Sequence, residues 1–259
     1  MTTQTSFEFL RVERDGGVFT LTLDRPPLNV LNVAMLRELD EALALLEEDQ
    51  GARLLVLTGA GKAFCAGVDV ADHTADRVRE MLELFHSAVR RILALEFPVV
   101  AAVNGAALGG GCELMLACDL VVVRADARLG QPEIRLGSMP PVAAVLLPRL
   151  VGRQRALDLV LTGRTIDAEE ARELGLVTRV LPADDFAPGV ESYVDHLASL
   201  SRPVLRLAKQ AVMEGAVLPF EQALQRTEEI YLDQLVNLDD AHEGLAAFLE
   251  KRDPVWKDA

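Results

Sequence analysis

The chemistry of this chain is most visible around Glu113, a glutamate inside an otherwise apolar run. Residues 98–123 contain only two charged side chains, Glu113 and Asp119, and Glu113 directly follows the glycines at 109–111. Burying an unpaired carboxylate is costly, so an apolar run of this length normally contains none. Glu113 is therefore a candidate functional residue. The glycines precede a predicted helix whose first N–H groups lack intrahelical acceptors. Free donors beside a half-buried carboxylate suit acyl transfer or enolate formation. The alternative is an ordinary first-turn acid, which the helix dipole favours.

A second carboxylate favours the chemical interpretation. Glu133 lies 20 residues after Glu113, directly after Pro132 and between Gly130 and Gly137. Proline fixes the local backbone, and the glycines allow close approach of other atoms. Two carboxylates on separate glycine-rich loops could act as a general acid and a general base around one substrate.

The elements that must position these loops follow an α/β pattern. A third small-residue loop, 62–69, contains Gly67, which could form a tight turn. The three loops, 62–69, 104–113 and 130–137, are each expected to leave a strand. Alternating apolar residues predict a hairpin, and apolar runs separated by amphipathic segments predict strands and helices in turn. The predicted elements are a hairpin at 8–14 and 18–24, strands at 53–58, 99–103 and 120–123, and helices at 33–48, 76–95 and 111–117.

After residue 153 the pattern becomes almost wholly helical, which predicts a helical layer on the α/β core. Prolines at 182, 188, 203 and 219 separate the segments. The predicted helices are 153–162, 167–174, 184–200, 202–215 and 219–249, with one strand at 177–181. Such a layer could be an oligomer interface or a cover within one chain.

The sequence lacks the motifs of other classes of enzyme. The glycine loop is not a GxGxxG sequence, no Gly-Lys-Ser/Thr follows it, and the chain has no GxSxG. Ser138 has no evident histidine partner, and Cys65 is expected to be a small buried thiol. The three cysteines show no CxxC spacing, and the four histidines form no HExxH motif. Neither a disulfide framework nor a metal site is therefore expected.

The composition limits which classes of molecule the protein is expected to bind. The chain has 259 residues, a net charge of −14 and a pI near 4.8, and half of its residues are apolar. This charge disfavours nucleic acid and anionic membrane surfaces as partners, although a few local cations could hold a small polyanion. No signal peptide is expected, and the glycines and glutamate of residues 98–123 make a membrane span there unlikely to form. We expect a reduced, cytoplasmic enzyme.

Four motifs together carry a resemblance to a known family. They are AFCAGVD, AAVNGAALGGGCELMLACD, GQPEIRLG and LTGRTIDAEEARELGLVTRV, in that order. This set resembles the crotonase (enoyl-CoA hydratase/isomerase) superfamily, and the resemblance covers nearly the whole chain. It implies an α/β fold with a spiral core of ββα units over residues 1–200, which holds an acyl-CoA site. It also implies a C-terminal helical trimerisation region over residues 201–259, in a homotrimer or homohexamer.

The resemblance also implies the site and the reaction. The substrate would be an acyl-CoA thioester of the kind used in fatty acid metabolism, with no metal and no cofactor beyond the coenzyme A of the substrate. The backbone N–H groups of Val68 and Gly110 would hold the thioester oxygen. Glu113 would position and deprotonate the attacking water, and Glu133 would exchange the proton at the α-carbon. The residues expected to contact substrate are Lys62, Ala63, Ala66, Val68, Asp69, Gly109 and Gly110, with Phe248 and Lys251 reaching the coenzyme A of a neighbouring subunit.

Departures from the family pattern leave the substrate open. Residues 139–145 read MPPVAAV where a glycine-rich stretch is common, and Val68 stands where alanine is common. The segments PPLNVLN and PPVAAVLLPRLVG are similar to cyclic dienoyl-CoA hydratases of aromatic-ring degradation. The leading expectation is addition of water to an enoyl-CoA. The alternatives are double-bond isomerisation at the same site and a non-catalytic scaffold of the same shape.

Overall fold

The structure, a computed structural model, describes residues 5–259. The chain divides into two compact units. One comprises the described residues through Leu95 together with Val99–Ser192, and the other comprises Glu96–Pro98 and Tyr193–Ala259. The expected functional division at residue 200 stays a prediction. No helix among the described residues is both long and apolar enough to cross a bilayer.

The main sheet has seven strands in the order β1-β2-β3-β4-β6-β8-β11. The predicted hairpin is confirmed by the antiparallel pairing of β2 with β3, and from β3 onward the neighbouring strands are parallel. Every residue of β6 is buried, as expected for a parallel strand covered on both faces. The strands are β1 (Thr5–Ser6), β2 (Leu10–Asp15), β3 (Val18–Leu23), β4 (Leu54–Gly59), β6 (Val99–Val103), β8 (Leu120–Arg124) and β11 (Arg179–Leu181).

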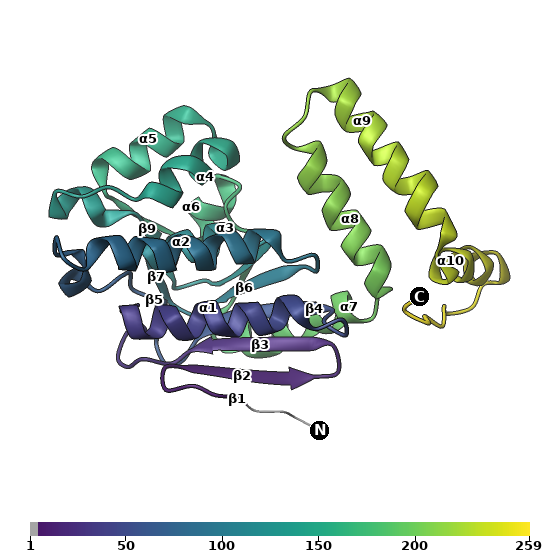
Figure 1. Ribbon diagram of the computed structural model, residues 1–259, viewed down its shortest axis with the longest axis horizontal. Helices are drawn as coiled ribbons and strands as arrows, with labels where there is room; N and C mark the ends of the chain where they lie inside the picture. The colour runs from purple at the N-terminus through teal and green to yellow at the C-terminus, as the bar shows by residue number, and fades with distance from the viewer. Residues whose placement is uncertain (1–4) are drawn as a thin grey trace. The chain divides into compact units, whose positions relative to one another are not determined.

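Two long helices, α1 (Val33–Glu48) and α2 (Val78–Ala94), pack side by side (Figure 1). The Asn32 side chain caps α1 by accepting the Met35 N–H at 2.9 Å. Both helices bury one apolar stripe, as their sequence periodicity predicted. The α1 prediction matches the structure at both ends, and α2 begins two residues later than expected.

A second, four-stranded sheet was not predicted. Its order is β10-β9-β7-β5, with strands of three residues each. The strand β10 pairs antiparallel with β9, whereas β9, β7 and β5 run parallel to one another. These strands lie inside or beside the segments that the sequence suggested were loops. The strands are β5 (Ala63–Cys65), β7 (Ala106–Leu108), β9 (Arg128–Gly130) and β10 (Thr165–Asp167).

The remaining elements of this region are helical, and one of them was missed. The helix α4 occupies Pro141–Val151, where no element was predicted from the sequence. It buries Val142, Ala143 and Leu147 among other residues. The others are the 3₁₀ turns η1 (Val70–His73), η2 (Pro132–Leu136) and η3 (Ala183–Asp185), and helices α3 (Gly110–Ala117), α5 (Arg153–Thr162), α6 (Ala168–Glu173) and α7 (Phe186–Ala198).

The C-terminal unit corrects one prediction. The expected single helix over residues 219–249 is instead α9 (Phe220–Glu229), a π-helical turn η4 (Ile230–Gln234), a 3₁₀ turn η5 (Leu235–Asn237) and α10 (Asp239–Glu250). Asp240 is buried at the start of α10. Its carboxylate accepts the Ser201 hydroxyl at 2.6 Å and the Lys257 N–H at 2.7 Å. The preceding helix α8 (Arg202–Gly215) packs against α9 (Figure 1).

Candidate active site

The three loops meet because they leave three adjacent strands. The strands β5, β7 and β9 are parallel neighbours in the second sheet. Parallel strands place their carboxyl ends at the same edge, so residues 66–69, the start of α3 and η2 gather there. The three loops therefore lie together because of a sheet that sequence patterning did not reveal.

The glycines before Glu113 are each required by a different neighbour. Gly109 has a positive φ of 52°, and a Cβ on it would lie 2.7 Å from Oε1 of Glu133. A Cβ on Gly111 would lie 2.1 Å from the carbonyl oxygen of Cys65. Side chains at these positions would therefore push apart the three loops. The start of α3 is thus in close contact with both neighbouring loops.

Glu113 lies in the first turn of α3 and is almost completely buried, with 3% of its surface exposed. Its Oε1 accepts the Ala143 N–H at 2.8 Å, at the start of α4. Burial raises the pKa of Glu113 to about 7, and the negative charge of Glu133 adds to that rise. The N–H groups of Ala143 and Val142 oppose it. The carboxyl is therefore poised to gain and lose a proton near neutral pH.

Glu133 lies in η2 and is half-buried. Burial also raises the pKa of this carboxyl, against the effects of its own backbone N–H and of His73. The buried Gln131, with its amide nitrogen facing Glu133, donates to both carboxylate oxygens at 3.2 and 3.3 Å. Two carboxyls with raised pKa values, each held by its own donors, can serve as an acid and base pair.

Val68 and Gly110 carry the two backbone N–H groups that the resemblance implicates. Leu31 pairs with this strand segment through the Gly67 carbonyl at 2.9 Å and the Asp69 N–H at 2.7 Å. In such a parallel bridge the N–H of the central residue, Val68, points to the opposite side. Neither the Val68 nor the Gly110 N–H donates to any group within residues 5–259. Both are free to bind an oxygen atom.

Packing contacts give one reason why residue 110 is a glycine. A Cβ there would lie 2.6 Å from Cγ2 of Val68 and 3.3 Å from the Phe85 ring. In the structure, the first obstruction is packing against Val68 and Phe85, which also sets how closely the two N–H-bearing segments approach.

The other expected contact residues lie in different settings. Ala63 is buried in β5, Ala66 is half-buried in the loop that follows, and Lys62 is exposed. The Asp69 carboxylate caps η1 and pairs with Arg25 at 3.3 Å. Phe248 and Lys251 belong to the C-terminal unit, where Phe248 is 81% exposed and Lys251 ends α10 in a left-handed conformation. The substrate contacts of all these residues stay predictions.

Three groups at the site were not identified from the sequence: Gln131, His73 and the N–H of Ala143. Gln131 is the residue before the Pro-Glu pair, so its place in the motif was a usable signal. The Nδ1 atom of His73 donates to the Asp69 carbonyl oxygen at 2.9 Å, and the charge of His73 lowers the pKa of Glu133. The Ala143 N–H could be found only by knowing that α4 starts there.

Two of the buried cysteines, Cys65 and Cys112, are held in the thiol form. Burial raises the pKa of Cys65 and of Cys112 to about 12, so both are neutral thiols at physiological pH. Cys65 is buried, as expected, and Cys112 lies against Gly130 and Gln131. Within residues 5–259, no cluster of three or more His, Cys, Asp or Glu side chains is arranged to hold a metal ion.

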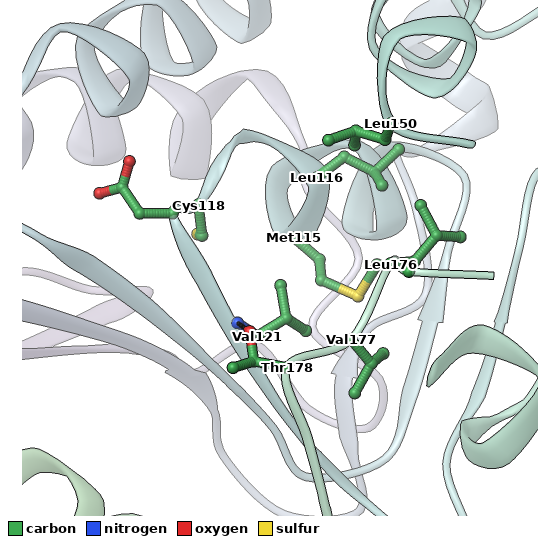
Figure 2. Close-up of a pocket in the computed structure, with 10 residues that line it drawn as sticks. Met115, Leu116, Cys118, Val121, Leu150, Leu176, Val177 and Thr178 are labelled. Atoms are coloured by element: carbon green, nitrogen blue, oxygen red, sulfur yellow. Dashed lines mark hydrogen bonds between the residues drawn. The ribbon is translucent and has the colours of Figure 1, made fainter. Parts of the chain in front are cut away.

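A separate cavity of about 170 Å³ lies at the other end of α3 (Figure 2). Apolar side chains from α3, α4 and residues 175–178 face it, among them Met115, Leu150 and Leu176. Its one carboxylate, Asp119, accepts the Val99 N–H at 2.7 Å. The cavity contains neither glutamate of the site, so it is distinct from the catalytic candidate.

Comparisons with known proteins place the chain in a family. The sequence profile of the family described as enoyl-CoA hydratase/isomerase matches residues 13–259. A Mycobacterium leprae protein named "Probable enoyl-CoA hydratase echA8" is 40% identical over 251 residues, spanning 96% of this chain and 97% of the relative. A cyclohexa-1,5-dienecarbonyl-CoA hydratase of Thauera aromatica is 39% identical over 246 residues, spanning 95% of both.

The fold is shared with solved structures of the same kind. The crystal structure of an enoyl-CoA hydratase from Bacillus anthracis superposes with a TM-score of 0.92 at 36% identity, covering 97% of this chain and all of the other. The predicted crotonase-like α/β fold is thereby confirmed. From its sequence profile, its relatives and its fold, this chain belongs to the enoyl-CoA hydratase/isomerase family.

Proposed function

We propose that this protein adds water across the double bond of α,β-unsaturated acyl-CoA thioesters. One observation carries the proposal: two carboxyls with raised pKa values lie on neighbouring loops, next to two backbone N–H groups that have no partner within residues 5–259. Proton transfer near neutral pH and stabilisation of an oxyanion are the two demands of this reaction.

In the proposed mechanism, the thioester oxygen accepts the N–H groups of Val68 and Gly110. Ionised Glu113 takes one proton from water as the water oxygen bonds to the β-carbon. The π electrons move toward the thioester oxygen and form an enolate, which the two N–H groups stabilise. Protonated Glu133 then delivers its proton to the α-carbon as the enolate collapses. Proton exchange between the carboxyls and solvent restores the starting state.

Placement of one N–H at the start of α3 supports the enolate step. Gly110 is the first residue of α3, where unpaired N–H groups and the helix dipole favour negative charge. Losing one such donor typically costs about 3 kcal/mol of barrier. No group beyond the thioester, water and these residues is needed to balance the reaction.

A cyclic dienoyl-CoA is the second candidate substrate. The Thauera aromatica relative is named for such a substrate and is 39% identical to this chain. The start of α4, where Pro140 and Pro141 stand in place of the glycine-rich stretch common in the family, is the local difference that would shape the acyl pocket. Double-bond isomerisation at the same two carboxyls is the remaining catalytic alternative.

We further propose a homotrimer or homohexamer in which Phe248 and Lys251 contact the coenzyme A of a neighbouring subunit. The C-terminal unit exposes large apolar side chains, including Val217, Phe220 and Leu249. Apolar groups exposed at this density are typical of association surfaces. In a protein of net charge −14, a local lysine would help to hold the phosphates of coenzyme A.

A panel of straight-chain and cyclic enoyl-CoA thioesters tests the proposal. Hydration removes the absorbance of the conjugated thioester and adds the mass of one water to the product. We expect both signals with at least one thioester. Absorbance loss without added mass would indicate another reaction, and no turnover of any thioester would contradict the proposal.

A further inference from the structure

The first turn of α4 has a restricted set of backbone donors. Its first residue, Pro141, has no N–H. The N–H groups of Val142 and Ala143 are directed at Glu113, and the Ala144 N–H donates to the Pro140 carbonyl at 2.9 Å. Each residue in this turn therefore either lacks an N–H group or has an N–H group that already faces an acceptor.

We propose that Pro141 is a positioning residue for Glu113, because it withholds a third backbone donor that the start of α4 would otherwise direct at that carboxylate. The inference rests on the proposed function only for its catalytic consequence. Proline is common at the first position of helices for reasons of conformation alone, so the experiment must separate the two roles.

Helix geometry gives the direction of the missing donor. The N–H groups of a first turn all point along the axis toward the N-terminus, where the helix dipole is positive. The next two N–H groups already face Glu113, and Pro141 is only half exposed. An N–H at position 141 would point toward the same end of the helix, where Glu113 already accepts from this turn.

A third donor would weaken Glu113 as a base. Each hydrogen bond to the ionised form of a carboxyl lowers its pKa, and carboxylates with two or three backbone donors can be strongly acidic. Burial now holds the pKa of Glu113 at about 7 against two donors. Pro141 thereby preserves the basicity that deprotonation of water requires.

Replacement of Pro141 by alanine, which fits a helix start and adds one N–H, tests this role. For Pro141→Ala we expect the acid limb of kcat/KM to move about 0.5–1 pH unit lower, with kcat a few-fold lower at its plateau. Pro148→Ala is the matched control, because Pro148 is an exposed proline in the same helix. It should leave both quantities unchanged. Pro141→Gly adds the same donor and should shift the limb in the same direction.

A second measurement does not depend on activity. The stability difference between the wild type and Glu113→Gln changes with pH as the buried carboxyl ionises. The same difference can be measured between Pro141→Ala and the double variant Pro141→Ala/Glu113→Gln. It should change less with pH in this pair, because the added N–H brings the pKa of Glu113 closer to its ordinary value. Equal changes in the two pairs, or an acid limb of Pro141→Ala like that of Pro148→Ala, would overturn the inference. Absence of hydratase activity in the wild type would contradict only the proposed function.

Discussion

The Ala143 N–H donates to Oε1 of Glu113 at 2.8 Å, so the buried carboxylate satisfies the start of a helix that has no cap of its own. Pro140 precedes α4 and offers no side-chain acceptor for the first-turn N–H groups. Glu113 fills that role from α3. The same contact that orients the glutamate for chemistry also joins the two helices.

This contact predicts how stability depends on pH. Because burial raises the pKa of Glu113 to about 7 from an ordinary value of 4.5, its contribution favours the folded state most below pH 4.5 and is lost as pH rises through 7. The Glu113→Gln variant does not titrate, so its stability relative to the wild type should increase over that range by on the order of 3 kcal/mol. Chemical unfolding of both proteins across this pH range measures the difference. A difference that stays constant with pH would contradict the assigned pKa.

Much of the site was visible in the sequence because its constraints are local. A glutamate after three glycines in an apolar run predicted a buried acid at a helix start, and α3 begins within one residue of the expected position. The Glu133 loop was identified by the proline before it and the glycines around it. The strand and helix patterns of the main sheet were equally clear, because those elements are long enough to show a period.

The elements that the sequence did not predict were missed for physical reasons. Strands of three residues are too short to display alternation, so β5, β7 and β9 appeared only as loops. The helix α4 has prolines at its start and one in its interior, a composition untypical of helices, although at the first position the lost N–H has no helical partner anyway. Asp240, at the start of α10, is held by Ser201 and Lys257, which are tertiary contacts that a local pattern does not show.

The contact between Gly110 and Val68 predicts a separable effect on packing and chemistry. Gly110→Ala places a Cβ 2.6 Å from Cγ2 of Val68, so we expect lower thermal stability and little activity. Val68→Ala removes that obstruction, and Val68→Ala/Gly110→Ala should regain stability. If the added methyl also intrudes on the oxygen site, the double variant stays at least about tenfold below Val68→Ala in kcat. Full recovery of kcat would show that Gly110 is needed for packing alone.

Gln131 should affect activity through the pKa of Glu133. Its amide donates to both oxygens of that carboxyl, and Gln131→Met removes the donors while keeping a similar volume. The pKa of Glu133 should rise further, so the basic limb of the activity profile moves to higher pH and kcat falls about tenfold. Gln225→Met, on the exposed helix α9, is the control. An unchanged basic limb in Gln131→Met would remove the proposed role.

Assembly and substrate binding should be linked through the C-terminal unit. Analytical ultracentrifugation should give a trimer or hexamer, and Lys251→Ala should weaken coenzyme A thioester binding a few-fold, more at low salt than at high salt. Lys257→Ala is a matched control, because Lys257 is engaged by Asp239 in the same unit. A fully active monomer would contradict the shared site, whereas an oligomer with unchanged affinity would contradict only the role of Lys251.

The central claim is that Glu113 and Glu133 act together as the acid and base that add water to an enoyl-CoA. The most direct measurement is kcat for Glu113→Gln and Glu133→Gln on the best thioester of the panel, with affinity for a saturated, unreactive acyl-CoA measured by calorimetry. Both variants should lose at least about 100-fold in kcat, since general acid and base groups typically contribute that much or more, while affinity changes little. Turnover within a few-fold of the wild type in both variants would contradict the mechanism.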